Sequence, residues 1–526
     1  MRRNQKWILC MCLAMALLLS ACGGSGGGAG GGKEAGSNPD GGGSGGGEQD
    51  VLTVALASEP TGLVGSQVNN LVSNTPICNI AEGLITVTPD GEYVPLLAES
   101  YEQVDDVTYR FHLKQGIQFH NGEEMKAEDV VYSLHAAAIS PQVKHASAMI
   151  DPEGFEIEDD YTVLIRTVSP YAPIIACLSH SANSIVCKSA WEAAGDDFIR
   201  SPVGTGPYRF VKWTSGESVE LTRFDGYHGE PAKTKDLIFR IIPEAASRVV
   251  ELETGGVDVI GDVPVNDLSR FEESPDQFTV YGKPGMRIYP VILNQQSEFF
   301  DDVRVRQALR YATNSKDIIS VVWNGLATDV STVMPPAVMG YTEDVTRYPT
   351  DVEKARALLA EAGYPDGFTC TLITSEASAN VKIAEIIQAQ WAQAGVTVNI
   401  DQMDNAAWLT KQNGMEFDVT VCPTNNSVGD PDANFTKMFR SDNVGPAGNY
   451  SGYQNPQVDE LIISACGSGD RQERIALYEQ IQKILADDAV WVPVGVPDLQ
   501  VATRACVQGF DLYANNTQRY QNVYKA

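Results

Sequence analysis

The chain has 526 residues, of which 43% are apolar and 20% charged, a composition typical of folded rather than disordered proteins. Its 68 acidic and 38 basic residues give a net charge of −30, which repels nucleic acid and anionic lipid headgroups. We therefore expect no nucleic-acid partner. The chain has ten cysteines, but C-x2-C pairs do not recur at the spacing of zinc sites. We therefore expect no structural metal.

The first 21 residues predict an export signal. Three basic residues precede an apolar run at 7–19, which is shorter than the roughly 20 residues that a membrane-spanning helix needs. The tetrad Leu19-Ser20-Ala21-Cys22 resembles the bacterial lipobox, in which cleavage precedes a cysteine that then carries the lipid. We expect removal of 1–21 and lipidation of Cys22. The alternative is an ordinary signal peptide with an incidental cysteine.

Residues 22–49 predict a lipidated cysteine and a flexible tether. Fifteen of the 25 residues at 23–47 are glycine, mixed with serine and a few polar residues. Cleavage would leave a chain of net charge −33, because 1–21 hold three basic and no acidic residues. Seven further cysteines would remain. A local disulfide between Cys177 and Cys187 stays open, although small buried apolar residues are the favoured interpretation.

Along the mature chain, strand and helix patterns alternate, which predicts a mixed α/β fold. The runs at 51–57, 108–113 and 162–168 are rich in β-branched and apolar residues and predict strands. Apolar positions at helical spacing predict helices at 302–314, 351–363 and 471–487. No internal repeat or second linker interrupts the chain after residue 50, so any lobes must be joined by strands that pass between them.

Signals of catalysis are missing from the sequence. There is no nucleotide-binding G-x4-G-K-[ST] loop, no H-E-x-x-H zinc helix and no Rossmann glycine fingerprint. His112 and His120 are more typical of hydrogen-bonded histidines than of metal ligands. Gly204-Thr205-Gly206-Pro207 predicts a structural turn rather than a phosphate cradle, because proline lacks an amide donor. We expect a protein that is not an enzyme and needs no cofactor or metal.

Several long blocks resemble one family, the extracytoplasmic solute-binding proteins of ABC importers that include dipeptide, oligopeptide and nickel-chelate binders. The blocks follow the family's order over most of the mature chain. They are VPLLAESYE (94–102), TYRFHLKQGIQFHNGEEMKAEDVVYSL (108–134), SPVGTGPYRFVKW (201–213), FDDVRVRQALRYATN (300–314), DVEKARALLAEAGYPDGFT (351–369) and NYSGYQNPQVDELI (449–462).

The resemblance implies a two-lobed periplasmic-binding-protein type II fold with an inserted subdomain in lobe I. By analogy lobe I comprises 50–286 with its inserted subdomain and a return at 490–526, and lobe II comprises 287–489. The lobes would close over a ligand by hinging at strands near 287–293 and 491–496. The resemblance also implies ABC permease subunits as partners, a monomer, and a location on the outer face of a bacterial cell membrane or in the periplasm, with the lipid as the only membrane anchor.

The resemblance also places the ligand contacts. The family's F-D-x5-W-x-x-D-x-x-D-P stretch supplies pocket residues, and its middle aspartate holds the α-ammonium in peptide binders. Its counterpart here is FDVTVCPTNNSVGDP (417–431), in which Thr424 replaces the tryptophan, Ser427 replaces the ammonium-binding aspartate, and Asp430 is kept. The remaining candidates in this stretch are Asn425 and Asn426. The loss of a charged acceptor at Ser427 argues against a dipeptide-type pocket.

Three further candidate ligand residues lie outside this stretch: Glu376, Asn405 and Trp408. Dipeptide-type members carry an arginine for the ligand carboxylate near the position of Thr374 and Glu376. A glutamate cannot bind a carboxylate, and it would favour a cationic ligand group if it faces the cleft. A solvated Glu376 on the lobe surface is the alternative.

The sequence thus predicts an importer's binding subunit that takes a peptide or a peptide-like small polar solute. A metal chelate or another non-peptide solute is the alternative within transport. A ligand-sensing lipoprotein would share the same sequence features. An extracytoplasmic hydrolase is disfavoured, since no nucleophile with a neighbouring base can be named.

Overall fold

The structure is a computed structural model that describes residues 50–526. The expected signal segment 1–21, the lipidation site Cys22 and the tether up to residue 49 lie outside the described residues. We keep the names lobe I and lobe II for the ranges given above. Helices and strands alternate along the described chain, as predicted.

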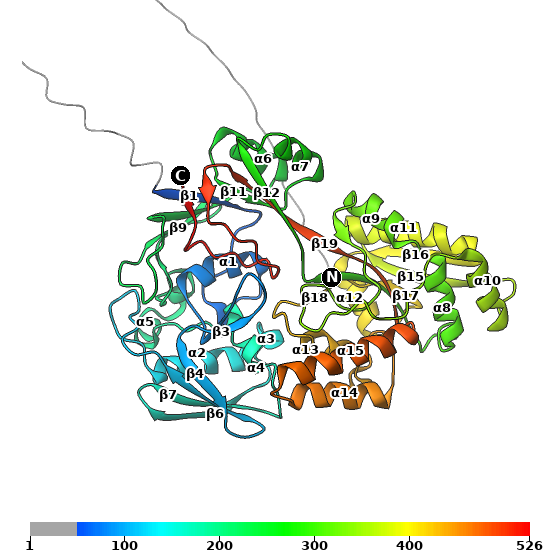
Figure 1. Cartoon of the computed structure of the whole chain (residues 1–526), viewed down its shortest axis with the longest axis horizontal. Helices are drawn as coiled ribbons and strands as arrows, with labels where there is room; N and C mark the ends of the chain where they lie inside the picture. The colour runs from blue at the N-terminus through cyan, green and yellow to red at the C-terminus, as the bar shows by residue number, and fades with distance from the viewer. Residues whose placement is uncertain (1–49) are drawn as a thin grey trace, which may run out of the picture. The chain divides into compact units, whose positions relative to one another are not determined.

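The strands of lobe I form one half of a 13-stranded sheet, in the order β11-β1-β10-β9-β8 (Figure 1). The predicted first strand is confirmed as β1, which runs parallel to both β10 and β11. The strands are β1 (Val51–Leu56), β8 (Tyr208–Thr214), β9 (Ser218–Arg223), β10 (Asp236–Ile241), β11 (Val259–Gly261) and β12 (Phe278–Pro284). The C-terminal segment adds the short pair β20 (Val507–Gln508) and β21 (Tyr524–Lys525).

The other half of the sheet belongs to lobe II and follows the order β16-β15-β17-β13. β15 runs parallel to β16 and β17, whereas β13 is antiparallel to β17. The strands are β13 (Arg287–Leu293), β14 (Ala327–Thr328), β15 (Phe368–Ser375), β16 (Val396–Met403), β17 (Val419–Val421) and β18 (Thr424–Asn425).

The long strand β19 (Trp491–Arg504) joins the two halves. Its first residues pair with β13, and its later residues pair with β11 and β12 (Figure 1). The register between β13 and β19 shifts at Tyr289 and Pro290. The two predicted crossing segments, 287–293 and 491–496, are therefore neighbouring strands at the junction of the sheet halves.

A separate antiparallel sheet, in the order β4-β5-β7-β6, occupies residues between β1 and β8 in sequence. The predicted strands at 108–113 and 162–168 are confirmed as β5 (Thr108–Leu113) and β7 (Thr162–Thr167). Buried side chains alternate along β5 because one face of this sheet packs on the core. The sheet is completed by β4 (Ala98–Gln103) and β6 (Ile150–Asp159), while β2 (Ile85–Val87) and β3 (Tyr93–Pro95) form a separate pair.

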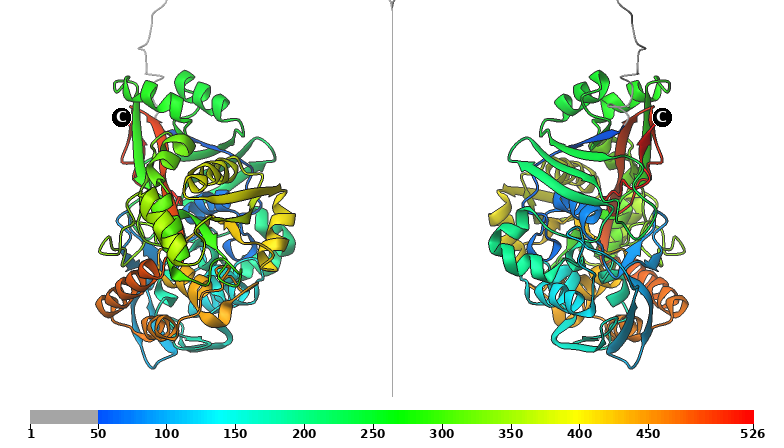
Figure 2. Two further views of the ribbon diagram at one scale, coloured as in Figure 1. Left: turned by 90° about the vertical axis from the view of Figure 1, so that its right-hand side faces the viewer. Right: turned by 90° about the vertical axis from the view of Figure 1, so that its left-hand side faces the viewer.

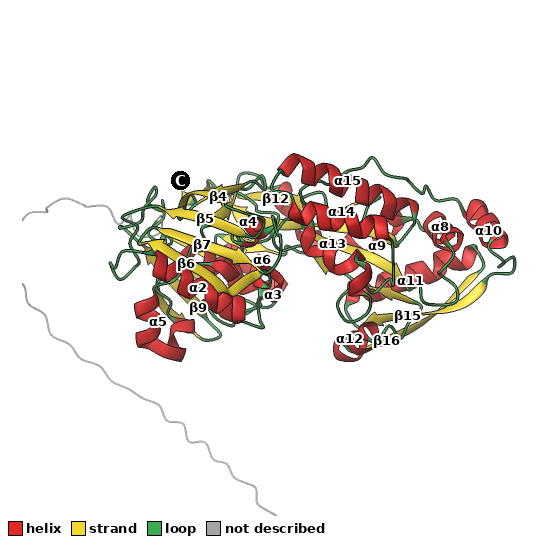
Figure 3. Cartoon of the chain, turned by 90° about the horizontal axis from the view of Figure 1, so that it is seen from below, coloured by secondary structure: helices red, strands yellow, loops and turns green. Residues whose placement is uncertain are grey.

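The three predicted helices are confirmed with their caps. Asp351 accepts the Lys354 amide at the start of α10 (Val352–Glu361), and Asp302 accepts the Arg304 amide at the start of α8 (Val303–Ala312). α15 spans Arg471–Asp487 and lies beside α13 and α14 (Figure 3). The other helices of lobe II are α9 (Ser315–Trp323), α11 (Ser378–Gln393), α12 (Asn405–Asn413), α13 (Asp432–Phe439) and α14 (Pro456–Gly467).

The lobe I helices pack on its two sheets. α6 (Ala245–Thr254) and α7 (Val265–Glu272) lie together beside β11 and β12 (Figures 1 and 2) and share a core with them. α2 (Ala127–Ile139) packs on the antiparallel sheet. The remaining helices are α1 (Leu71–Ile80), α3 (Lys144–Ser147), α4 (Ile174–Cys177) and α5 (Lys188–Ala194).

The hydrophobic core is divided in the same way as the sheet. Two large clusters draw their fully buried residues from 286–496, and three others draw theirs from 52–278 and 501–523. A small cluster joins the two groups, because Val428 packs against Ala137, Val143, Ala146 and Ala182. No helix in the described part of the chain is both long and apolar enough to cross a membrane.

Candidate ligand-binding site

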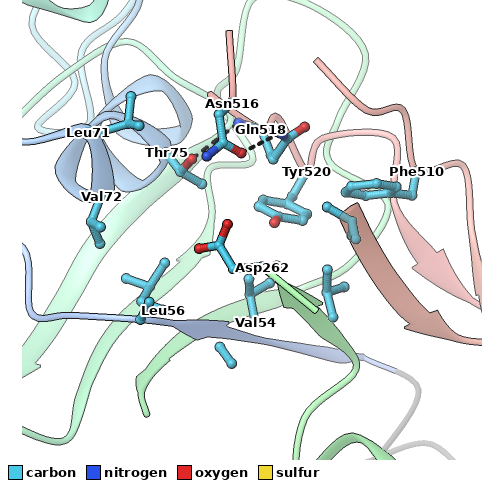
Figure 4. A pocket seen from close by; sticks show the side chains of 15 residues that line it. Val54, Leu56, Leu71, Val72, Thr75, Asp262, Phe510, Asn516, Gln518 and Tyr520 are labelled. Carbon is cyan, nitrogen blue, oxygen red and sulfur yellow. Dashed lines mark hydrogen bonds between the residues drawn. The ribbon is translucent and has the colours of Figure 1, made fainter. Parts of the chain in front are cut away.

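A pocket of about 150 Å³ lies where parallel strands of lobe I end (Figure 4). β1 and β11 run parallel and end at Leu56 and Gly261, and both residues line the pocket. α1, β19 and the segment 510–520 supply the other walls. In open α/β sheets ligands bind beyond the carboxyl ends of the strands, so this is the position expected of a ligand pocket.

The pocket contains a single charged side chain. Asp262, directly after β11, is the only acid or base among the fifteen lining residues. Asp262 and Asn516 both adopt positive φ angles, 51° and 58°, a conformation that aspartate and asparagine tolerate better than most residues. On the polar wall the backbone N–H of Gln518 donates to Thr75 Oγ1 at 3.2 Å. Burial raises the pKa of the Tyr520 phenol, which therefore stays protonated.

Two candidate residues of lobe II lie together at the corresponding edge of the other half of the sheet. β15 and β16 are parallel and end side by side, with Ser375 paired to Met403. Glu376 follows β15, and Asn405 is the first residue of α12, two positions after β16 ends. Both side chains are exposed. The structure thus brings Glu376 and Asn405, 29 positions apart, to one edge.

The segment 424–430 begins at this half of the sheet and then forms a tight loop. Thr424 and Asn425 pair with Ile288 and Arg287 of β13. Asn426 is buried and holds the loop, because its side chain accepts the Gly429 amide at 2.8 Å and donates to the Asp430 carbonyl at 2.7 Å. Ser427 is half-buried, and its hydroxyl forms no hydrogen bond with another described residue.

Two candidate residues, Asp430 and Trp408, form hydrogen bonds with other residues of lobe II. Asp430 is buried and forms a bidentate ion pair with Arg474, at 2.7 and 2.8 Å. Trp408 is buried in the core of lobe II, and its Nε1 donates to Thr420 Oγ1 at 3.1 Å. Both side chains therefore already have hydrogen-bond partners within lobe II.

The segment 424–430 also touches lobe I. The Tyr93 hydroxyl donates to the Val428 carbonyl at 2.5 Å, and burial is the main cause that raises the pKa of Tyr93. Val428 itself packs among alanines and a valine of lobe I. The loop that the sequence assigned to ligand contacts thus lies at the junction of the lobes.

A larger pocket of about 320 Å³ lies close to this junction. Tyr93, Tyr101 and Tyr109 of lobe I line it together with Arg471 and Arg474 of lobe II. Both arginines already have acidic partners, since Arg471 pairs with Glu92 at 3.1 Å and Arg474 with Asp430. This pocket also lies against the antiparallel sheet rather than at the ends of parallel strands, so it is the weaker candidate for the ligand.

The sequence reasoning missed the lobe I residues Asp262, Asn516 and Gln518. A signal for Asp262 was present: an acidic residue two positions after the short β-branched run Val259-Ile260, where a strand is expected to end. The segment 510–520 carries no comparable pattern. Its place in the pocket depends on contacts with α1, more than 400 positions away, such as that of Gln518 with Thr75.

The described residues show no reactive cysteine pair or metal-ligand cluster. All seven cysteines from Cys78 to Cys506 are free, so the local bridge between Cys177 and Cys187 is not formed. Burial raises the pKa of Cys78 to about 11 and that of Cys177 to about 12, which keeps both thiols protonated and unreactive. Within residues 50–526 no group of three or more His, Cys, Asp or Glu side chains is arranged to hold a metal ion.

Comparison with known proteins places these features in a family. The model of the bacterial extracellular solute-binding proteins, family 5 (middle region), matches residues 92–446. Three similar proteins are heme-binding protein A of Haemophilus influenzae (31% identity, covering 80% of this chain and 83% of the relative), glutathione-binding protein GsiB of Salmonella paratyphi A (31%, 87% and 91%) and the dipeptide-binding protein of Escherichia coli (30%, 86% and 89%).

The fold is matched as well. The structure of HbpA2 from Haemophilus parasuis superposes with a TM-score of 0.84 at 27% identity and covers 90% of this chain and all of that chain. The expected mixed α/β binding-protein fold is therefore confirmed, and with it the expectation of a binding protein rather than an enzyme. The chain belongs to family 5 of the bacterial extracellular solute-binding proteins.

Proposed function

We propose that the chain captures a peptide or a peptide-like small polar solute and delivers it to the permease of an ABC importer. The observation that carries this proposal is the pocket at the ends of β1 and β11, the position at which α/β proteins bind ligands. The relatives named for glutathione and for dipeptides support a peptide-like ligand. The protein would act as a monomer, with no resident cofactor.

The proposed mechanism is closure of two lobes, 50–286 with 490–526 and 287–489, over the ligand. Lobe I would supply the pocket of Asp262, and lobe II would supply Glu376, Asn405 and the segment 424–430 at its facing edge. The division of the core into groups at 286–496 and at 52–278 with 501–523 supports two lobes, with residues 490–496 packing in the core of lobe II. The permease would then recognise the closed form, because a ligand that prefers this form raises its population.

We further propose that Cys22 carries a lipid that holds the protein at the outer face of the membrane. The 28 residues at 22–49 would act as a tether with a mean reach of roughly 25–30 Å, so the lobes could turn freely beside the membrane. A Cys22→Ala variant should be released from the membrane or remain as an uncleaved precursor. Fractionation and mass determination of the N-terminus test this, and a variant that stays attached and is cut at the same position would contradict it.

The ligand is best identified with the protein purified from its own source. Native mass spectrometry should find a bound solute of peptide mass, because a closed binding protein retains its ligand. Calorimetric titration with glutathione and with tri- to pentapeptides then measures affinity. Absence of binding to all of these, together with a non-peptide mass in the native spectrum, would overturn the peptide assignment.

A metal chelate or another non-peptide solute is the second candidate. The relative named as a heme-binding protein supports it, as does the serine at position 427 where peptide binders hold an ammonium. Titration with heme, followed by its absorption spectrum, separates this candidate from peptides. If the protein is a sensor, the liganded protein should cross-link to a membrane receptor rather than to a permease.

A further inference from the structure

We infer that the lobe I pocket is a cation subsite, in which Asp262 binds an ammonium or guanidinium group of the ligand. This inference rests on the proposed function and adds the charge of the ligand group that the pocket takes. Figure 4 shows the Asp262 carboxylate between Thr75 and Tyr520 on one side and Leu56 and Val54 on the other. No basic side chain lines the pocket, so a bound cation would meet no competing charge there.

The two acids that flank β11 show why Asp262 is available to a ligand. Asp258, just before the strand, is buried and accepts from the Thr53 amide at 2.9 Å, from Arg504 at 3.3 Å and from Lys525 at 3.2 Å. Asp262, just after the strand, is exposed and has no hydrogen bond or ion pair with any residue of the described chain. Asp258 is thus a structural acid, whereas both oxygens of Asp262 are free to accept.

The walls define the rest of the ligand group. Val54, Leu56, Leu71 and Phe510 present apolar surface around the carboxylate. An engineered apolar cavity of about 150 Å³ binds benzene, so the lobe I pocket fits a hydrocarbon body of about four to six carbons. A short alkyl chain that ends in a positive charge matches this combination of apolar walls and one carboxylate. A carboxylate ligand would be repelled by Asp262.

The position of the cation subsite accounts for the serine found at position 427 in place of the family's aspartate. Ser427 stands where peptide binders of the family are expected to hold an ammonium from lobe II. Asp262 offers a carboxylate from lobe I instead, and Glu376 adds a second exposed acid on lobe II. Ligand cations would therefore bind mainly to lobe I before the lobes close.

The test uses n-butylammonium as probe on the whole mature chain, with 1-butanol and butyrate as neutral and anionic analogues. Ligand-observed NMR should detect binding of n-butylammonium and neither analogue. Asp262→Asn should weaken binding at least tenfold, since asparagine keeps the positive φ but removes the charge. Asp276→Asn removes another exposed acid, which lies outside the pocket, and serves as the matched control, which should bind as the wild type does.

Several outcomes would overturn the inference: no binding of n-butylammonium, equal binding by Asp262→Asn, or an equal loss in Asp276→Asn, which would indicate diffuse attraction to an acidic protein. Competition by glutathione or by a tripeptide that the wild type binds would place the subsite within the ligand cleft. If no peptide or glutathione binds while n-butylammonium depends on Asp262, the cation subsite stands and the peptide assignment fails. If peptides bind and Asp262→Asn changes neither their binding nor that of n-butylammonium, the peptide assignment stands and the cation subsite fails.

Discussion

Ser427 is the residue at which the expected ligand specificity is most sharply testable. Its hydroxyl is half-buried and forms no hydrogen bond within the described chain, so a substitution here disturbs little. We predict that dipeptides bind the wild type with millimolar affinity or not at all, because the segment 424–430 offers no free carboxylate for their ammonium and Thr374 and Glu376 offer no cation for their carboxylate. Ser427→Asp should create or strengthen dipeptide binding.

Calorimetric titration with di- to pentapeptides measures this, with Ser427→Ala as the control that changes the hydroxyl without adding charge. Micromolar or tighter dipeptide binding by the wild type would refute the argument. Dipeptide binding that appears only in Ser427→Asp would place residue 427 in the pocket.

Asp430 leads to a prediction about stability. Its pair with Arg474 is buried, with the two side chains 2% and 7% exposed, so removing one charge leaves the other uncompensated. Asp430→Asn should lower the free energy of unfolding by about 3–5 kcal/mol. Urea unfolding measures this loss. Asp344→Asn, which breaks an exposed pair with Lys483, should change stability little, and an equal loss in both variants would contradict the prediction.

The same residues show what the sequence could predict about the site. The resemblance of the segment 417–431 predicted ligand contacts, and the structure places its part at 424–430 at the lobe junction. The resemblance could not tell that Asp430 pairs with Arg474, because this partner lies 44 positions further along the chain. Trp408 likewise turns inward to Thr420, a contact between a helix and a strand. Residue types were therefore predictable, whereas side-chain directions depended on tertiary contacts.

At the scale of single elements, prediction succeeded where the determining signal is local. α8 and α10 begin after aspartates whose side chains accept backbone amides within three residues. The segment 515–520 shows the opposite case. Asn516, Gln518 and Tyr520 line the pocket of Asp262, and Asn515, Thr517 and Arg519 line a separate small cavity. Contacts with α1 and β11, which are far away in sequence, decide which side chains of this segment line each cavity.

The turn at 204–207 is an element whose sequence interpretation the structure supports. Gly204 and Gly206 lie so close to the Ile80 carbonyl that an added Cβ would be 2.3 and 2.7 Å from its oxygen. His120 spans the turn, because its Nε2 donates to the Gly206 carbonyl at 3.0 Å while Nδ1 accepts the Gly204 amide at 3.4 Å. The bond that Nδ1 accepts requires a neutral ring, and burial lowers the pKa of His120 to about 4.

Stability should therefore fall on acidification. Between pH 6.5 and 4 the unfolded chain binds a proton at His120 that the folded chain does not, so unfolding becomes easier as the pH falls. The loss is about 1.4 kcal/mol per pH unit, or about 2 kcal/mol at pH 5. Thermal unfolding of His120→Asn should depend less on pH than that of the wild type. His135→Asn is the control, and equal pH dependence in all three proteins would contradict the assignment.

At the scale of the whole molecule, β19 connects the two halves of the sheet. Val492 and Val494 belong to a core cluster of lobe II, while Val501 and Ala502 belong to core clusters of lobe I. Both ends of the strand are thus fixed, and the residues between them must accommodate any rotation. The register shift in the pairing of β13 with β19 lies beside Gly495, where the ladder is least regular. The two-lobed arrangement was predictable from the resemblance, but this irregularity was not.

Ligand binding should close the lobes about β13 and the first half of β19. Small dihedral changes at 495–498 would rotate one lobe, because the strand is anchored on either side. The ligand shifts the equilibrium only as far as it binds the closed form better, so saturation must be verified by calorimetry. Small-angle scattering should then show a smaller radius of gyration for the saturated protein than for protein freed of ligand by unfolding, dialysis and refolding. Butyrate, which we expect not to bind, should leave the profile unchanged. Identical profiles with and without a saturating ligand would contradict hinge closure and leave a preformed site as the mode of binding.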